Sequence, residues 1–424
     1  MSKRTSRTVA AAVAAATAAA LAVGSAPAAV ANPYPGGISV GSPPIEPGTY
    51  SSELKAANGN GDSVSFVIVG DLTRGENIRT YMLLWRADWS TESLALLPGD
   101  AGGSPVGINN ARTVVGTSTA QVGGRQHAVR WASPSTPTEM PPLPGDTTAA
   151  PAAIGDNGTA VGSSWGEAGE AGEAGEAGEA GTAGTAGAAA AKHAVAWPAS
   201  GAPVVLPPLP GDTESEAVAV NSSGTAVGYS YPAGGPASRR AVAWSPDGTV
   251  TALDVPAGYV TSSAARITDS GVVIGAGRPG GEPSVDHALV WNAAGAVSDL
   301  GAGSQATAVN NAGTVVGGVG GQAARWAVDG TPLPLAPTTL TSVATGINDQ
   351  GVIVGYTSDP WPARAQLRAR RWNPDGSVIA LPEWSKDFPY AMPLFVTDSG
   401  IVLGELLLRG LAGYGKPLTM RWTM

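Results

Sequence analysis

Short runs of β-branched residues alternate with glycine-containing turns along most of the chain, and no apolar stripe of helical period follows the N-terminal segment. Strings such as NNAGTVVG at 310–317 and TDSGVVIG at 268–275 place an Asn/Asp-x-Gly turn directly before a valine-rich run. Glycine accepts the positive φ that such turns need, and β-branched residues favour strands. The pattern therefore predicts β-hairpins.

The hairpin pattern belongs to a longer repeat. A string ending in Val-Gly recurs eight times, with closing glycines at Gly70, Gly116, Gly162, Gly228, Gly275, Gly317, Gly355 and Gly404. After each copy an apolar string ends in tryptophan: Trp85, Trp131, Trp197, Trp244, Trp291, Trp326, Trp372 and Trp422. The period is about 45 residues, except where a low-complexity insert lengthens one interval.

Each repeat can be divided into four short strands, called A to D here. Strand A is rich in small residues, as in AVAVN at 217–221, and strand B is the Val-Gly run. Strand C is the His-Ala-Val-x-Trp run, and strand D leads into Leu-Pro, as in VVLPPLPGD at 204–212. Four strands at this period are typical of a propeller blade. We predict an all-β fold, a β-propeller of eight four-stranded blades, or seven if a divergent terminal unit forms no blade.

Strand A should lie beside the central axis, and the tryptophan of strand C should fill the wedge between neighbouring blades. The last repeat stops at Met424 directly after its strand C. Residues near 38–52 could supply its strand D and close the ring by pairing the N- and C-terminal segments, which removes an exposed edge. Residues 32–50 are thus expected to be a linker with a possible closing strand, and 51–424 the propeller.

Residues 1–31 have the pattern of a secretory signal peptide. Lys3, Arg4 and Arg7 precede an Ala-rich apolar stretch at 9–23, and Ala29-Val30-Ala31 offers a small-x-small cleavage site. The alternative is a retained anchor helix, although the stretch is short for a bilayer span. We expect a secreted, extracellular protein whose mature chain has no membrane span.

The strings HAVRW, HAVAW and HALVW, followed by LPPLPGD and then A-x-A-V-N-x-x-G-x-x-V-G, resemble the HAF repeats of bacterial extracellular proteins. The resemblance covers about residues 50–424. The histidine is absent from units one, six, seven and eight, and unit four has Arg240 in its place, while Leu-Pro-Gly-Asp occurs only in the first three units. The resemblance implies an extracellular location and a repeat architecture, and it implies no catalytic residues.

The composition excludes or disfavours several kinds of site and partner. The 424 residues include no cysteine, which excludes disulfides, thiolate zinc sites and a cysteine nucleophile. The formal net charge of −9 disfavours a nucleic-acid partner held by phosphate contacts. No cofactor is predicted.

All three histidines, His127, His193 and His287, occupy the same place in the strand C string. A metal ring or a general base would use such residues. Because other units hold arginine or glutamine there, we favour a structural role, and we predict no catalytic or metal-binding residue.

The Leu-Pro-Gly-Asp strings place one aspartate at an equivalent point of three repeats: Asp100, Asp146 and Asp212. Carboxylates on one rim could bind calcium or act as a glycosidase pair. An aspartate after Pro-Gly more often bonds its own backbone in a turn, and that interpretation is favoured.

One face of the propeller is expected to carry the ligand. The B–C and D–A connections share this loop-rich face, which holds the three aspartates and the flexible Gly-Glu-Ala insert at 166–187. Three tryptophans outside the repeat position are also predicted there: Trp165 and Trp361 in B–C loops and Trp384 in a D–A loop. They could stack on sugar rings or cap small satellite cores.

The first hypothesis for function is a secreted, non-enzymatic, monomeric protein that binds a glycan or a surface protein through the loop-rich face. The alternative is an extracellular hydrolase or lyase that acts on polysaccharide with rim carboxylates. A structural component of the cell exterior is the third possibility.

Overall fold

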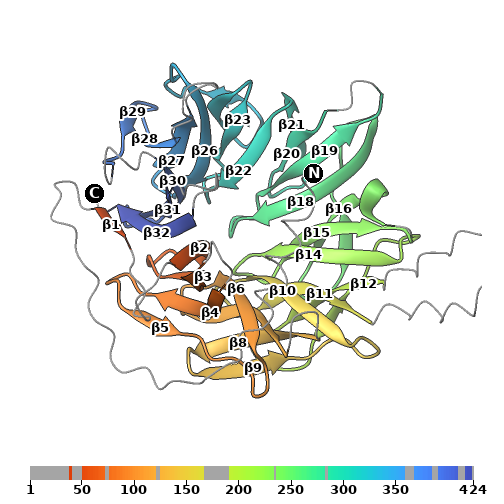
Figure 1. Ribbon diagram of the computed structural model, residues 1–424. Coiled ribbons are helices and arrows are strands. Elements are labelled where there is room, and N and C mark those ends of the chain that lie inside the picture. Colours follow the sequence, from red (N-terminus) through yellow and green to blue (C-terminus); the bar gives the residue numbers. More distant parts are fainter. Residues whose placement is uncertain are drawn as a thin grey trace, which may run out of the picture.

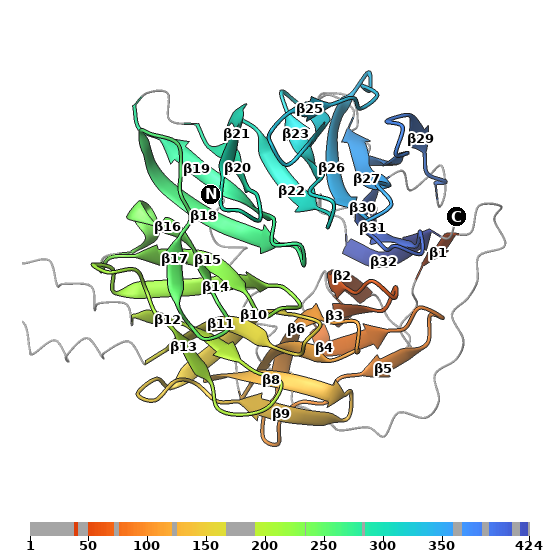
Figure 2. The ribbon, with the colours of Figure 1, turned by 180° about the vertical axis from the view of Figure 1, so that it is seen from behind.

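The described residues form eight four-stranded antiparallel sheets in a closed ring, which is a β-propeller (Figure 1). The computed structural model describes residues 38–40, 50–71, 76–120, 125–166, 191–233, 235–281, 285–358, 367–383, 390–408 and 416–422. In both views the first strand of each blade faces the centre and the later strands lie progressively outward (Figure 2). The predicted fold and the blade number of eight are confirmed.

The first four blades follow one another along the chain. Blade 1 contains β2 (Tyr50–Ala57), β3 (Ser63–Asp71), β4 (Glu76–Trp85) and β5 (Thr91–Ser93). Blade 2 contains β6 (Gly102–Ile108), β7 (Val114–Thr119), β8 (Gln126–Ser133) and β9 (Thr136–Met140). Blade 3 contains β10 (Thr148–Ile154), β11 (Ala160–Trp165), β12 (Lys192–Trp197) and β13 (Val204–Leu206). Blade 4 contains β14 (Glu214–Val220), β15 (Ala226–Tyr231), β16 (Arg240–Trp244) and β17 (Val250–Ala252), with a 3₁₀ turn, η2 (Pro236–Ser238), before β16.

The other four blades complete the ring. Blade 5 contains β18 (Tyr259–Ile267), β19 (Val273–Pro279), β20 (His287–Trp291) and β21 (Val297–Ala302). Blade 6 contains β22 (Gln305–Val309), β23 (Val315–Val319), β24 (Gln322–Trp326) and β25 (Pro332–Leu333). Blade 7 contains β26 (Thr341–Ile347), β27 (Ile353–Ser358), β28 (Leu367–Trp372) and β29 (Val378–Ala380). Blade 8 contains β30 (Ala391–Val396), β31 (Val402–Leu408), β32 (Lys416–Trp422) and β1 (Ile38–Val40).

The ring is closed by pairing of the two ends of the chain, as predicted. Strand β1 is the outer strand of blade 8 and pairs antiparallel with β32, so that Ile38 lies opposite Trp422. Towards the axis, the side chains of Ser52 in blade 1 and Thr419 in blade 8 share a 2.7 Å hydrogen bond. The ring is therefore closed by a backbone ladder within blade 8, far from the axis, and by a side-chain hydrogen bond between blades 8 and 1, nearer to the axis.

The repeated tryptophans fill the wedges between blades. All eight are nearly or fully buried. The indole Nε1–H of Trp131 donates to the carbonyl of Ala95, in the D–A connection of the preceding blade, at 2.7 Å. Trp197 makes the corresponding bond to Pro141. Trp244, Trp291, Trp372 and Trp422 do the same, so these six rings join two blades through their buried area and through their polar atom.

The first repeat is aligned differently from the sequence interpretation. Leu54 of strand A pairs with Ser65, as Pro105 pairs with Gly116 in the next blade. Ser65 and not Gly70 therefore stands at the repeated glycine position, and strand A begins at Tyr50, one residue before the predicted boundary. The Ser65 hydroxyl accepts a 2.7 Å bond from Trp85 Nε1.

Polar residues at the A–B turns connect neighbouring blades around the axis. In blade 2, the Asn109 side chain donates to the Gly155 carbonyl of blade 3 at 3.1 Å and accepts from the Thr113 N–H of its own turn at 2.9 Å. Asn58 and Asn348 repeat this double contact in blades 1 and 7. The buried asparagine that ends strand A is therefore a link between blades.

Within the described residues, no helix is long and apolar enough to cross a membrane.

Candidate functional site

On the loop-rich face, the predicted aspartates bond to strand C of their own blades. Asp100 Oδ2 lies 3.1 Å from His127 Nδ1, and the Asp146–His193 pair repeats this distance. In blade 4 an arginine replaces the histidine, and Arg240 reaches Asp212 Oδ2 at 2.8 Å. This geometry supports the structural interpretation of His127 and His193.

These aspartate side chains are enclosed. Those of Asp100, Asp146 and Asp212 are 4%, 8% and 5% exposed. Each residue closes its turn through its backbone N–H, which donates to the leucine carbonyl three positions earlier. The carboxylates bond across the blade, whereas the sequence had favoured bonds to their own backbone. They hold the loop in place and present little surface to a ligand.

The third histidine has a different partner. His287 Nδ1 lies 2.9 Å from Asp299, on strand D, and 2.8 Å from the hydroxyl of Tyr259, at the start of strand A. Blade 5 has no Leu-Pro-Gly-Asp turn, so a carboxylate from strand D takes that place. The histidine position is therefore tied to an aspartate in each of these three blades.

Of the three predicted tryptophans, the structure describes only Trp165. It is the last residue of β11 and pairs with Lys192 of β12, so it belongs to a strand and not to a loop as predicted. Trp361, Trp384 and, apart from Gly166, the insert at 166–187 lie outside the described residues.

Trp165 belongs to a group of side chains that joins blades 3 and 4, called the blade 3–4 cluster below. Its members are Trp165, Lys192, Glu216, Tyr229, Tyr231 and Arg239. Lys192 Nζ lies 6.0 Å from the centre of the Trp165 ring and 3.1 Å from Glu216 Oε2. The other oxygen of Glu216 accepts a 3.0 Å bond from the Tyr231 hydroxyl. Glu216 is thus the centre of the cluster.

The two tyrosines extend the cluster towards Arg239. Their rings lie 5.9 Å apart, and the Arg239 guanidinium lies 5.8 Å from the centre of the Tyr229 ring. Burial, together with the Glu216 charge, raises the pKa of Tyr229 to about 12 and that of Tyr231 further. Both hydroxyls are therefore neutral hydrogen-bonding groups at physiological pH.

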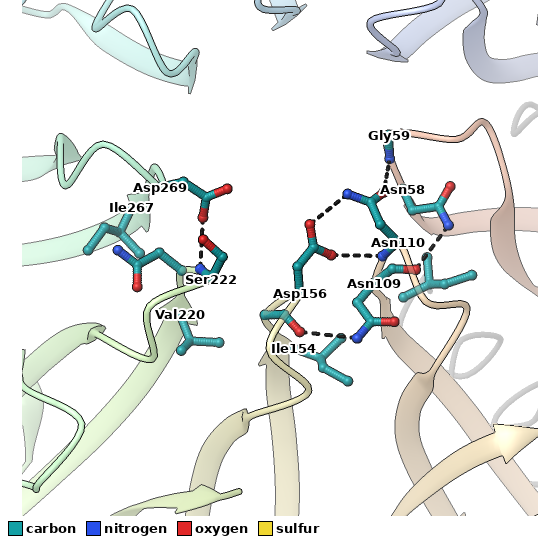
Figure 3. A pocket seen from close by; sticks show the side chains of 13 residues that line it. Asn58, Gly59, Asn109, Asn110, Ile154, Asp156, Val220, Ser222, Ile267 and Asp269 are labelled. Atoms are coloured by element: carbon teal, nitrogen blue, oxygen red, sulfur yellow. Dashed lines mark hydrogen bonds between the residues drawn. The ribbon is translucent and has the colours of Figure 1, made fainter. Parts of the chain in front are cut away.

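Two hollows lie on the opposite face, at the axis, where the A–B turns meet. One hollow of about 190 Å³ is bounded by turns of blades 1 to 5 (Figure 3). Another of about 350 Å³ is bounded by turns of blades 1 and 5 to 8. Figure 3 shows Asn110 and Asp156 facing each other, with Asn110 donating to both carboxylate oxygens. The sequence interpretation had placed the ligand on the other, loop-rich face.

The turn residues form a chain of bonds around the axis. The backbone N–H of Ser222 donates to Asp269 in the next blade at 2.7 Å, and Asn311 donates to Asp349 in the same way. The Asn-rich turns in the sequence were a usable signal for these bonds, because polar residues recur at the same turn positions in most repeats. Lys192, Glu216 and Tyr229 carried no such signal, since they do not recur.

The predicted carboxylates do not belong to a metal-binding group in the described residues. Among the residues that the structure describes, no three histidine, aspartate or glutamate side chains gather so that they could hold a metal ion.

Comparisons with known proteins give fold-level similarities. No protein family and no curated protein matches the sequence. A puromycin hydrolase structure matches with a TM-score of 0.45 and 15% identity over 84% of this chain, which spans 58% of that chain. An oligogalacturonate lyase in complex with manganese matches with a TM-score of 0.43 and 9% identity, over 90% of this chain and 98% of that one. The structure of TolB from Acinetobacter baumannii matches with a TM-score of 0.33 and 12% identity, over 69% of this chain and 80% of that one. Similarity at this level carries no information about substrate or activity.

Proposed function

We propose that this protein is a secreted, monomeric member of the HAF-repeat proteins that binds an extracellular glycan without acting on it. The observation that carries the proposal is the blade 3–4 cluster, an aromatic and charged group on the loop-rich face. The export pattern at residues 1–31 supports the location.

The cluster has the side chains that a saccharide site uses. Trp165 and Tyr229 are half-buried and supply ring surface, while Lys192, Glu216 and Arg239 supply hydrogen-bonding groups around them. All of these residues except Arg239 lie on strands of two neighbouring blades, and strands hold side chains more rigidly than loops do. The Gly-Glu-Ala insert joins Trp165 to Lys192 along the chain, so the site lies at its base.

The alternative of a polysaccharide hydrolase or lyase has less support. Its rim carboxylates were Asp100, Asp146 and Asp212, which are nearly buried and paired with a histidine or an arginine. A general acid must reach the leaving-group oxygen, and a carboxylate enclosed in a structural pair does not. Binding without turnover fits these positions better.

The test measures retention on a panel of insoluble cell-wall and plant polysaccharides. We expect the wild-type protein to be retained by at least one of them and Trp165→Ala to bind about tenfold more weakly, because a stacking ring is lost. Val205→Ala is the matched control, since Val205 lies on the outer strand of the same blade and is 52% exposed.

Retained polysaccharides are then assayed for cleavage. Release of oligosaccharides that is lost in Asp100→Asn or Asp146→Asn would establish the enzymatic alternative. Retention on no polysaccharide, or equal loss in Trp165→Ala and Val205→Ala, would contradict glycan binding at the cluster.

A further inference from the structure

Six of the eight inner strands have a small residue at one particular position, and the inner strands of the other two blades have a large one there. The position two residues before each A–B turn residue is small in six blades: Ala56, Gly107, Ala153, Ala219, Ala308 and Gly346. Neighbouring inner strands converge there, and a Cβ on Gly346 would lie 2.9 Å from the Leu394 carbonyl oxygen. Blades 5 and 8 hold Arg266 and Phe395 at this position instead.

Both exceptions line the same axial hollow. Arg266 and Phe395 are among the residues that enclose the 350 Å³ hollow, whose size is at the lower end of the roughly 300–1,000 Å³ found for ligand sites. Blades 5 and 8 stand three places apart in the ring, so the two side chains approach the hollow from different directions. A cation and an aromatic ring thus face one space that the other blades leave to small residues.

The charge of Arg266 has no partner in the described part of the chain, where its side chain takes part in no hydrogen bond or ion pair. Desolvation by the surrounding chain lowers the pKa of its guanidinium, and no carboxylate opposes that effect, although part of the side chain is exposed to solvent within the hollow. A guanidinium without a partner that lines a hollow can pair with an anionic ligand group, and a carboxylate fits its two-pronged geometry.

The entrance to the hollow has the opposite charge. Three exposed carboxylates among its lining residues, those of Asp269, Asp349 and Asp398, occupy the same turn position in their blades. Each accepts a backbone N–H from the preceding blade, at 2.7–2.9 Å. An occupant therefore meets negative charge at the mouth and positive charge further in.

The order of these charges suits a peptide that enters from the mouth. Arg266 lies on β18, which ends at Ile267, and Asp269 follows in the A–B turn. We propose that the hollow receives the C-terminal end of a basic peptide. Its terminal carboxylate binds Arg266, its last, apolar side chain packs on Phe395, and a lysine or arginine two or three residues earlier meets the ring of aspartates.

Acidic sugars fit less well. A uronic acid would also offer a carboxylate to Arg266, but each further acidic unit of an oligosaccharide would face the aspartates at the mouth. The inference concerns the face opposite the blade 3–4 cluster, and it stands or falls separately from glycan binding there.

The test uses fluorescence-labelled hexapeptides with lysine at the third and fourth positions from the end and leucine at the end, as free acid or C-terminal amide. We expect the wild-type protein to bind the acid at least about tenfold more tightly than the amide, as for a charge-assisted hydrogen bond. Arg266→Gln should remove this difference, and Phe395→Ala should weaken both peptides.

The matched control is Arg278→Gln. Arg278 is an exposed arginine at the far end of β19, where it pairs with Asp286 at 2.7 Å, so its loss should leave the acid–amide difference unchanged. Asp349→Asn combined with Asp398→Asn should reduce the salt dependence of binding. Thermal unfolding confirms that each variant is folded, and Arg266→Lys, which keeps the charge, should retain part of the preference.

Three results would overturn the proposal. They are equal affinity of the wild-type protein for acid and amide, absence of binding to either peptide at millimolar concentration, and displacement of the peptide by galacturonate at lower concentration than by the unlabelled acid peptide.

Discussion

At the scale of single residues, the glycine that closes the Val-Gly string is fixed by a close approach of two strands. In blades 2 to 8, a Cβ at this position would overlap a carbonyl oxygen of strand A, as Gly317 shows against Gln305. Strand A has a β-bulge at that point in every described blade, for instance between Ala306 and Ala308 in blade 6. The bulge brings the strand A backbone towards strand B, and in blades 2 to 8 the missing side chain of glycine leaves room for it, whereas blade 1 has Ser65 at this position.

Gly317→Ala should therefore lower the free energy of unfolding by about 2–3 kcal/mol, the usual effect of forcing extra volume into a packed region. Gly318→Ala is the adjacent control, because a Cβ there would meet only the Gln322 carbonyl oxygen, at 3.4 Å. Its effect should stay within about 0.5 kcal/mol. Urea unfolding measures both, and equal effects would show that the close approach is not the cause.

A second residue-scale feature is a buried carboxyl group at the joint between blades 8 and 1. Glu405 is 7% exposed, and its Oε1 accepts a 2.9 Å bond from the Leu54 N–H. Burial raises the pKa of Glu405 above its ordinary value of 4.5. The folded state therefore binds this proton more tightly than the unfolded chain does, and stability from this group is complete below pH 4.5 and lost as pH rises through the folded pKa.

Glu405→Gln keeps an acceptor for Leu54 and removes the ionisation. The variant should melt at a higher temperature than the wild-type protein at pH 7, and the difference should shrink as the pH falls towards 4.5. Calorimetry at several pH values measures this trend. A variant that is less stable at pH 7 would show that ionised Glu405 contributes favourably to the joint.

At the scale of elements, the A–B turns do more than reverse the chain. Their asparagines and aspartates bond to the next blade, so each hairpin is stabilised by its neighbour as well as by its own ladder. The strand A serines act similarly: Ser262 and Ser342 accept backbone N–H bonds from strand C of the preceding blade. A blade makes few contacts with helices or loops. The hydrogen bonds between neighbouring blades therefore make the unfolding of the ring cooperative.

Asn109→Ala removes a donor to Gly155 and an acceptor for Thr113, which leaves the part-buried Thr113 N–H without a partner and the buried Gly155 carbonyl with only its bond from the Gly158 N–H. We expect a loss of about 2–3 kcal/mol in the free energy of unfolding. Asn157→Ala is the control, because Asn157 is exposed and makes one bond, to the Thr159 N–H. If both variants lose the same stability, the link between blades is not what the asparagine provides.

At the scale of the whole molecule, the propeller depends on β1. Three residues from one end of the chain complete a blade whose other strands come from the opposite end. Without them, the edge of β32 would be open, and open edges pair with other chains. The closing strand therefore contributes to stability and opposes association.

A chain that begins at residue 42 should be less stable than one that begins at residue 32, by about 1–3 kcal/mol for the lost ladder bonds. It should also associate at high concentration. Thermal unfolding and light scattering of the two chains give the comparison. Identical melting temperatures would mean that the ring is held closed by the side-chain contacts near the axis alone.

The amino-acid sequence by itself determined the blade, its four strands, the number of repeats and the closing role of the N-terminal segment. These features follow from local patterns that recur, since a tight turn, a β-branched run and a wedge tryptophan are specified within one repeat. The alignment of the first repeat from the sequence was wrong. Ser65 stands at the repeated glycine position there, and Gly70, a few residues later, follows a similar valine-rich string.

Only the tertiary structure decided which residues meet across blades. His127 and His193 pair with aspartates that lie 27 and 47 positions away, and Glu216 joins two blades through residues that do not recur. Arg266 and Phe395 share a hollow although 129 positions separate them in the chain, since ring closure places blades 5 and 8 around the same axis. Such contacts depend on how blades are arranged around a centre, and no pattern within a single repeat encodes that arrangement.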